Sequence, residues 1–266
     1  MIRTLVELCA GASAVSLALV APRVRPLVAW AGGKRRLAPD ILHAISVDRD
    51  APWHCLLVEA GEWARIWPVV LDQSTARACA RIVEGYGHDA DSAVWRRLGE
   101  TPPPADPVER AAHWLYLQGR AAAGQPVYWT EAGWRMGSGR LSEVGGTAES
   151  PLRPHALACR IRRVHDALRG RVSILEADVR EVEPIPCDAV VFDPPYVRAV
   201  RYELDCSRPD VLRVASRWAA VAPTLVCEAE PLPLVDWHHR QLAEREWVTV
   251  SRPIPEPRQG SLWRAA

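Results

Sequence analysis

The sequence predicts an α/β protein in which a smaller lobe is inserted into a mostly parallel, doubly wound sheet. Short apolar runs with strand character alternate with stretches of helical periodicity along most of the chain, and this alternation is typical of parallel sheets. Between residues 86 and 154 the character changes, and glycine, proline and tryptophan dominate. We therefore expect a main domain formed by residues 1–85 and 155–266, with residues 86–154 as the inserted lobe.

The expected elements follow the same alternation on both sides of the lobe. Before it we predict a strand at 4–8, a helix at 14–20, a helix that follows a glycine turn and runs to 45, a strand at 54–59 and a mostly helical stretch at 62–84. After it we predict helices at 155–168, 209–221 and 234–242, and strands at 172–175, 189–192, 224–227 and 247–250. Within the lobe, only residues 107–123 have a convincing helical pattern.

The composition is that of a globular protein without an obvious polyanionic partner. Of the 266 residues, 48% are hydrophobic and 24% are charged, and the formal net charge is +1, so any DNA-binding face must be local. The seven cysteines form no Cys-x-x-Cys pair, which argues against a zinc site or a disulfide framework. Since no apolar run reaches the ~20 residues of a membrane span and no signal peptide is recognisable, we expect a cytoplasmic protein with no metal and no membrane partner.

The strongest chemical signal is Asp193-Pro194-Pro195-Tyr196, which follows the apolar run 189–192. In open α/β sheets the reactive crevice lies at the carboxyl ends of the strands, so this stiff turn faces the crevice. The Asp193 carboxylate and the Pro194 carbonyl can accept the two hydrogens of an amino group on a flat ring, and Tyr196 can stack on that ring. The lone pair of such a nitrogen is delocalised into the ring, so the nitrogen is a poor nucleophile and must be oriented toward the methyl group. The turn therefore indicates methyl transfer from a sulfonium donor, with catalysis by positioning and electrostatics.

A second motif, residues 30–34, reads Trp-Ala-Gly-Gly-Lys and contains the only lysine of the chain. Together with residues 193–196 it resembles the Dam-like, alpha-class adenine-N6 DNA methyltransferases. Residues 7–15 resemble the cofactor loop of that family, with Cys9 and Ser13 where the family has phenylalanine and glycine. This loop precedes the Trp-Ala-Gly-Gly-Lys motif here, whereas it usually follows it in the family. The likeness extends from residue 7 to residue 196 and is specific at the two motifs.

The resemblance implies a Rossmann-like methyltransferase sheet that binds S-adenosyl-L-methionine, and a lobe that recognises its target in double-stranded DNA. A duplex hides the adenine amino group, so the target base would have to flip into the pocket. The implied catalytic residues are Asp193, Pro194, Pro195 and Tyr196. The implied cofactor-binding residues are Glu7, Ala10 and Gly11 at the methionine end, Trp30, Gly33 and Lys34 over the cofactor with Lys34 near its carboxylate, Glu59 at the ribose and Asp178 at the cofactor adenine.

The lobe supplies the expected contacts to DNA. Arg135 and Arg140 are candidates for phosphate contacts. Four tryptophans could stack on bases or wedge between them, but we assign half of them to the core of the lobe itself. They are Trp95, Trp114, Trp129 and Trp134.

Several alternatives stay open at this stage. The same turn suits an RNA adenine or a cytosine-N4 amino methyltransferase, and a binding module that has lost transfer activity is also compatible. Carbon-5 cytosine chemistry is less favoured, because Cys187 lies at the wrong end of its strand to serve as a nucleophile. A dinucleotide oxidoreductase would need a full Gly-x-Gly-x-x-Gly motif, which residues 10–16 lack. Glu228 and Glu230, which end a strand, have no assigned role.

Overall fold

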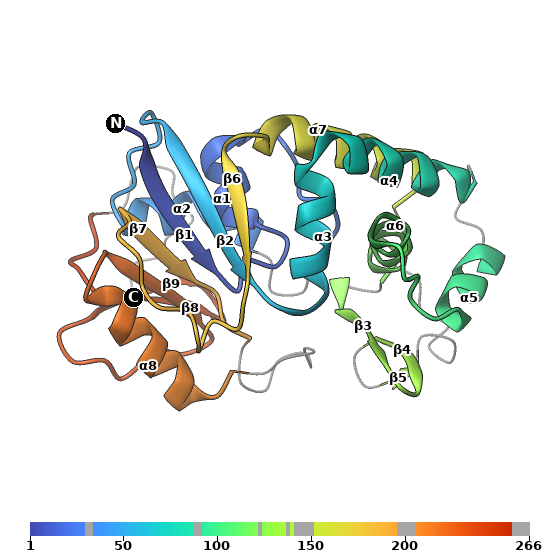
Figure 1. The fold of residues 1–266 in the computed structure, drawn as a ribbon. Helices are drawn as coiled ribbons and strands as arrows, with labels where there is room; N and C mark the ends of the chain where they lie inside the picture. Colours follow the sequence, from blue (N-terminus) through green and yellow to red (C-terminus); the bar gives the residue numbers. More distant parts are fainter. Residues whose placement is uncertain are drawn as a thin grey trace.

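The computed structural model describes residues 1–29, 34–87, 92–121, 124–136, 139–140, 152–195 and 206–256 (Figure 1). Its main sheet has seven strands in the order β6-β2-β1-β7-β8-β10-β9. The first five pair in parallel, and β10 and β9 extend the sheet in antiparallel fashion. The strands are β1 (Arg3–Leu8), β2 (Trp53–Glu59), β6 (Val172–Glu176), β7 (Ala189–Phe192), β8 (Thr224–Glu228), β9 (His238–Ala243) and β10 (Glu246–Val250).

Helices cover both faces of this sheet, as the doubly wound prediction requires. Along β1, Leu5 packs in one hydrophobic cluster with α1 (Ala14–Val20) and α2 (Ala38–Ala44). Its neighbours Val6 and Leu8 point to the opposite face and pack against α8 (Arg208–Ala219). The strand β7 is buried along its whole length, because a central parallel strand is covered on both sides. The α/β architecture with a mostly parallel sheet is therefore confirmed.

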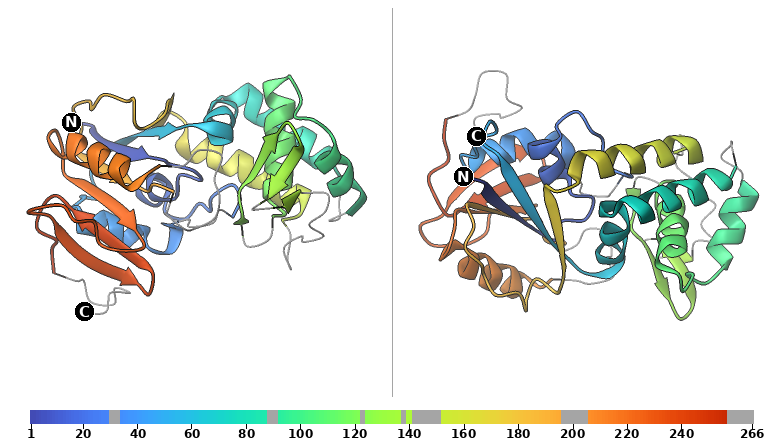
Figure 2. Two further views of the ribbon diagram at one scale, coloured as in Figure 1. Left: turned by 90° about the horizontal axis from the view of Figure 1, so that it is seen from below. Right: turned by 45° about the horizontal axis from the view of Figure 1, so that its top comes forward.

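The lobe lies beyond the β6 edge of the sheet, as both views of Figure 2 show. The helices α3 (Gly61–Leu71) and α4 (Gln73–Gly85) lead into it, and α7 (Pro154–Leu168) leads back along α4. Between them lie α5 (Ser92–Glu100), α6 (Pro107–Gln118) and a small antiparallel sheet. The strands of this sheet are β3 (Val127–Thr130), β4 (Gly133–Met136) and β5 (Gly139–Arg140).

The lobe shares its core with the main domain. One continuous hydrophobic cluster joins residues of the central strands to residues of α3, α4, α6 and α7. Trp95, Trp114 and Trp134 are all buried in this cluster, and Trp129 packs edge-on against Trp134. Half of the four tryptophans were expected in the core, but three are there. Stacking of those three on a base would require the lobe to open.

Four expectations about local structure were wrong or incomplete. The stretch 62–84 is two helices, because Asp72 is extended and its side chain accepts the backbone N–H groups of Ser74 and Thr75, both at 3.0 Å, as an N-cap. The helix expected at 107–123 ends at Gln118. Within the lobe, α5 and the three-stranded sheet were not foreseen. The helix expected at 234–242 is instead the strand β9, since its backbone pairs with β10.

Candidate functional site

The candidate site lies where the strand order reverses, at the carboxyl ends of β1 and its two neighbours. The chain proceeds outward from β1 through β2 to β6 on one side, and from β7 to β8 on the other. Such a switch point leaves a crevice above the strand ends, which is where open α/β sheets bind ligands. The parallel register is continued beyond the strands, because the Asp193 N–H donates to the Leu8 carbonyl at 3.2 Å and the Ala10 N–H to the Val58 carbonyl at 3.4 Å. Glu7, Glu59 and Asp193 therefore meet at one edge.

The loop after β1 has an unusual backbone. Cys9, Gly11 and Ser13 all adopt left-handed conformations, with φ of 55°, 47° and 52°. Glycine adopts this region at little cost, whereas Cys9 and Ser13 are strained there. The indole N–H of Trp67 donates to the Gly11 carbonyl at 2.9 Å and holds the loop against α3. Ala10 is buried beside Gly11, so the loop brings its backbone to the crevice without large side chains.

Glu7 is a buried carboxylate that holds the loop by accepting hydrogen bonds from the start of α1. It accepts the backbone N–H groups of Val15 at 3.3 Å and Ser16 at 2.8 Å, and it also accepts the Ser16 hydroxyl. These groups belong to the first turn of α1, whose positive dipole end favours an anion. Burial nevertheless raises the pKa of Glu7 to about 7, and the nearby Asp193 charge adds to the rise.

Glu59 ends β2 and closes the loop from the other side. Its side chain accepts the Gly11 N–H and, at 3.0 Å, the N–H of Ala60. Burial raises the pKa of Glu59 to about 7, and repulsion by Glu7 and Asp193 acts in the same direction. The ribose role of Glu59 stays a prediction, but its present partner is the cofactor loop itself.

Lys34 begins the short 3-10 helix η1 (Lys34–Arg36) and is only 3% exposed. Its ammonium lies 3.0 Å from Oδ1 of Asp193 and 3.6 Å from Oε2 of Glu246 at the start of β10. Burial opposes the charged form, but the attraction of Asp193 and Glu246 outweighs it and raises the pKa of Lys34 above its ordinary value. Lys34 and Asp193, the lysine and the acid of the two motifs, are therefore in direct contact.

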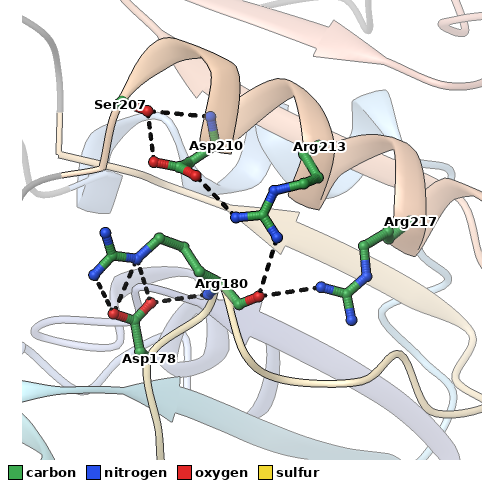
Figure 3. Close-up of polar contacts among 6 residues, drawn as sticks. All are labelled: Asp178, Arg180, Ser207, Asp210, Arg213 and Arg217. Atoms are coloured by element: carbon green, nitrogen blue, oxygen red, sulfur yellow. Dashed lines mark hydrogen bonds and ion pairs between the residues drawn. The ribbon is translucent and has the colours of Figure 1, made fainter.

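Asp178 lies beyond the end of β6 and is held by Arg180 (Figure 3). The Arg180 side chain and backbone N–H both donate to this carboxylate, and its side chain lowers the pKa of Asp178. The Arg180 carbonyl in turn accepts Arg213 at 3.4 Å and Arg217 at 3.1 Å, both on α8. The carboxylate predicted to bind the cofactor adenine thus has a guanidinium as its partner, which an amino group would have to displace or share.

Two further acids lie near these strand ends. The sequence left Glu228 without a role, and it did not single out Glu246. Glu228 ends β8 and is buried, and burial raises its pKa to about 7. Glu246 starts β10, which pairs with β8 so that Trp247 lies opposite Glu228. The sequence signal for Glu246 is its place directly before the strand-like run 247–250, after the polar pair Glu244-Arg245.

The other predicted site residues divide into three groups. Pro194 is buried and Pro195 half-buried directly after Asp193, as expected of the turn. Trp30, Gly33 and Tyr196 lie outside the described residues, as does the side chain of Arg140. Arg135 lies on β4 of the lobe, away from the strand ends, with its Cα opposite that of Arg140 in the β4–β5 ladder. Cys187 precedes β7, at the end of the strand opposite to Asp193.

No protein-family model matched the chain, and no curated protein matched it. The resemblance to adenine methyltransferases therefore depends on the motifs and on the site. Across the described ranges, no helix combines the length and apolar character needed to cross a membrane. In the same part of the chain, no three or more histidine, cysteine, aspartate or glutamate residues are grouped so that they could hold a metal ion.

Chemically, the described strand ends are acidic, and the Lys34 ammonium lies against Asp193 and Glu246. In their ionised forms Glu7, Glu59 and Asp193 would attract a cationic group, and residues 10–11 of the loop carry no large side chain. Carboxylate acceptors of this kind favour a cationic ligand over an anionic one. An anionic dinucleotide fits these acceptors poorly.

Ser13 provides a test of the loop geometry. Its backbone is left-handed and its hydroxyl, fully buried, has no hydrogen-bond partner among the described residues. We expect Ser13→Gly to increase the free energy of unfolding by about 1 kcal/mol, because it removes both the strain and the unpaired hydroxyl. Urea unfolding measures this, and Ser13→Ala, which removes only the hydroxyl, should gain less. A loss of stability in Ser13→Gly would contradict the described loop.

Glu7 and Glu59 predict a pH dependence of stability. Their folded-state pKa of about 7 lies above the ordinary value of 4.5, so the folded protein binds more protons than the unfolded chain between these pH values. Stability is therefore highest below pH 4.5 for this pair and falls as the pH rises through 7, by on the order of 3 kcal/mol for each carboxyl. In urea unfolding at pH 5.5 and 8, Glu7→Gln should reduce this fall. An unchanged fall would exclude a raised pKa of Glu7.

Proposed function

We propose that this protein is an S-adenosyl-L-methionine-dependent methyltransferase that acts on the exocyclic N6 of adenine in DNA. The observation that carries the proposal is the place of Asp193. It follows β7 at the switch point of the sheet, it is 23% exposed, and it contacts the lysine of the second motif. Two motifs separated by more than 150 residues thus meet in the crevice where this fold binds ligands.

The acids of the crevice support a cationic methyl donor. S-adenosyl-L-methionine supplies an electrophilic methyl group on a positively charged sulfonium, and its methionine end carries an ammonium. Ionised Glu7 and Glu59 would favour these charges, and the loop at Ala10 and Gly11 carries no large side chain that would keep the donor away. Binding of a cation beside these two carboxyls also offsets the burial that raises their pKa.

The turn after β7 would hold the acceptor. Asp193 and the Pro194 carbonyl can accept the two N–H groups of an amino nitrogen, which directs its lone pair toward the methyl group. As the N–C bond forms and the S–C bond breaks, positive charge develops on the nitrogen and is stabilised by the Asp193 carboxylate. The nitrogen then loses one hydrogen as a proton, and Asp193 is an acceptor within the same contact.

The preference for DNA depends on the lobe. The lobe lies to one side of the main sheet (Figure 2). In its small sheet, the Cα atoms of Arg135 and Arg140 lie at opposed positions of the β4–β5 ladder. Arginine side chains commonly contact DNA phosphates, so these two positions are the lobe's candidates for contacts with the DNA backbone. The burial of three lobe tryptophans leaves arginines and loop backbone, rather than stacking rings, as the expected groove contacts.

The substrate class is tested by transfer of labelled methyl from S-adenosyl-L-methionine to unmodified duplex DNA, RNA and single-stranded DNA, followed by nucleoside mass spectrometry. We expect N6-methyladenine in duplex DNA. Label in RNA or on the cytosine amino group would keep the amino-group chemistry and overturn the substrate. Binding of the cofactor without transfer to any of these polymers would identify the protein as a binding module and overturn the proposed function.

Asp193→Asn tests the catalytic assignment. We expect the rate of methyl transfer to fall by about 10²–10³-fold, because the charge that stabilises the reacting nitrogen is lost. The Kd for S-adenosyl-L-methionine, measured by calorimetry, should change by less than about threefold, since Asp193 faces the acceptor. The matched control is Asp188→Asn at the opposite end of β7, where Asp188 accepts the Thr4 N–H at 2.7 Å. Equal loss of transfer and cofactor binding in Asp193→Asn would contradict the assignment.

A further inference from the structure

Lys34 contributes a buried ammonium to the candidate site, and its contacts are more specific than its motif implies. The ammonium lies between two carboxylates that come from different strands, Asp193 after β7 and Glu246 at the start of β10. Asp193 and Glu246 are 23% and 24% exposed, whereas Lys34 is 3% exposed. A buried lysine without acidic partners loses its proton readily, so these two contacts keep the ammonium charged.

Asp193 needs such a partner because it lies among other acids. In the part of the chain that the structure describes, Glu7 comes from β1, Glu59 from β2 and Glu228 from β8, and each of the three interacts electrostatically with Asp193. Like charges at short range favour protonation of one member of the group, and a protonated Asp193 would be a weaker acceptor. The titratable groups that face Asp193 in these ranges include Glu7, Cys9, Glu59, Lys34, Cys227 and Glu228.

We propose that Lys34 is a positioning residue that orients Asp193 and keeps it ionised, and that Glu246 positions Lys34. This inference rests on the methyltransferase function proposed above. It differs from the role that the motif implies for Lys34, which is contact with the carboxylate of the cofactor. Glu246 acts through Lys34 because its carboxylate is 3.6 Å from the ammonium and is carried by the antiparallel strand that follows β8 in the sheet.

The two roles of Lys34 predict opposite kinetic signatures. Lys34→Met should lower kcat by about 100-fold through misplacement of Asp193, with KM for S-adenosyl-L-methionine changed by less than about threefold. The low-pH limb of kcat should also move to higher pH, because a carboxylate that loses its neighbouring cation protonates more readily. Lys34→Arg should restore part of kcat. The matched control is Arg36→Met, which removes an exposed cation from the same short helix and should leave both constants unchanged.

A double-mutant cycle tests whether Glu246 acts through Lys34 or has only a structural role. Glu246→Gln alone should lower kcat by about three- to tenfold, since it removes the charge of one carboxylate that lies against the ammonium. In the Lys34→Met background the same change should cause no further loss, because Glu246 then has no ammonium to hold. Independent, multiplicative losses would overturn the role of Glu246.

A measurement without turnover is possible because the chain has a single lysine. Protein labelled with ¹³Cε-lysine gives one lysine signal, which should move strongly in Asp193→Asn and Glu246→Gln and little in Arg36→Met. Addition of S-adenosyl-L-methionine should shift it less than Asp193→Asn does. A signal that ignores Asp193→Asn but responds strongly to the cofactor overturns the inference, as does a KM effect without a kcat effect in Lys34→Met. If the wild-type protein transfers methyl to no polymer, the proposed function is overturned instead. The signal of the labelled lysine still reports on the ion pair between Lys34 and Asp193 in that case.

Discussion

The parallel pairing of β1 with both β2 and β7 is the constraint on which the candidate site depends. Successive strand residues point to opposite faces, so the register decides which side chains meet at the strand ends. Here it brings Glu7, Glu59 and Asp193 to the same edge and the same face. A shift of one residue in β7 would turn Asp193 toward α8 and away from Lys34. Both faces of β1 are covered, with Leu5 packed on one side and Val6 and Leu8 on the other.

Charge balance is the second condition of the site. Four acids at the strand ends would repel one another in a partly buried crevice, and three of them have a pKa raised to about 7. The backbone N–H groups of α1 and of the loop stabilise Glu7 and Glu59, and the Lys34 ammonium stabilises Asp193. A cationic ligand would complete this balance. The same arrangement that destabilises the ligand-free protein above neutral pH would therefore favour a sulfonium donor.

The lobe is built as an extension of the main core. Its buried tryptophans pack with α3 and α6, and Glu62 at the start of α3 forms an ion pair with Arg110 of α6. A lobe fixed in this way would present its small sheet at a constant distance from the crevice. Under the proposed function, the movement needed for catalysis would then fall on the flipped base and on the crevice loops rather than on the lobe as a whole.

The strands β1, β2, β6, β7, β8 and β10, the doubly wound architecture and the position of Asp193 at a strand end could be predicted from the sequence, because apolar periodicity is a local property. The strand β9 could not, since its residues 238–243 have no strong period and their structure depends on pairing with β10. The contact between Lys34 and Asp193 and the place of Glu246 were decided by the tertiary structure alone. Residues 34, 193 and 246 are distant in the chain, and only the sheet order and the packing of η1 against it bring their charges together.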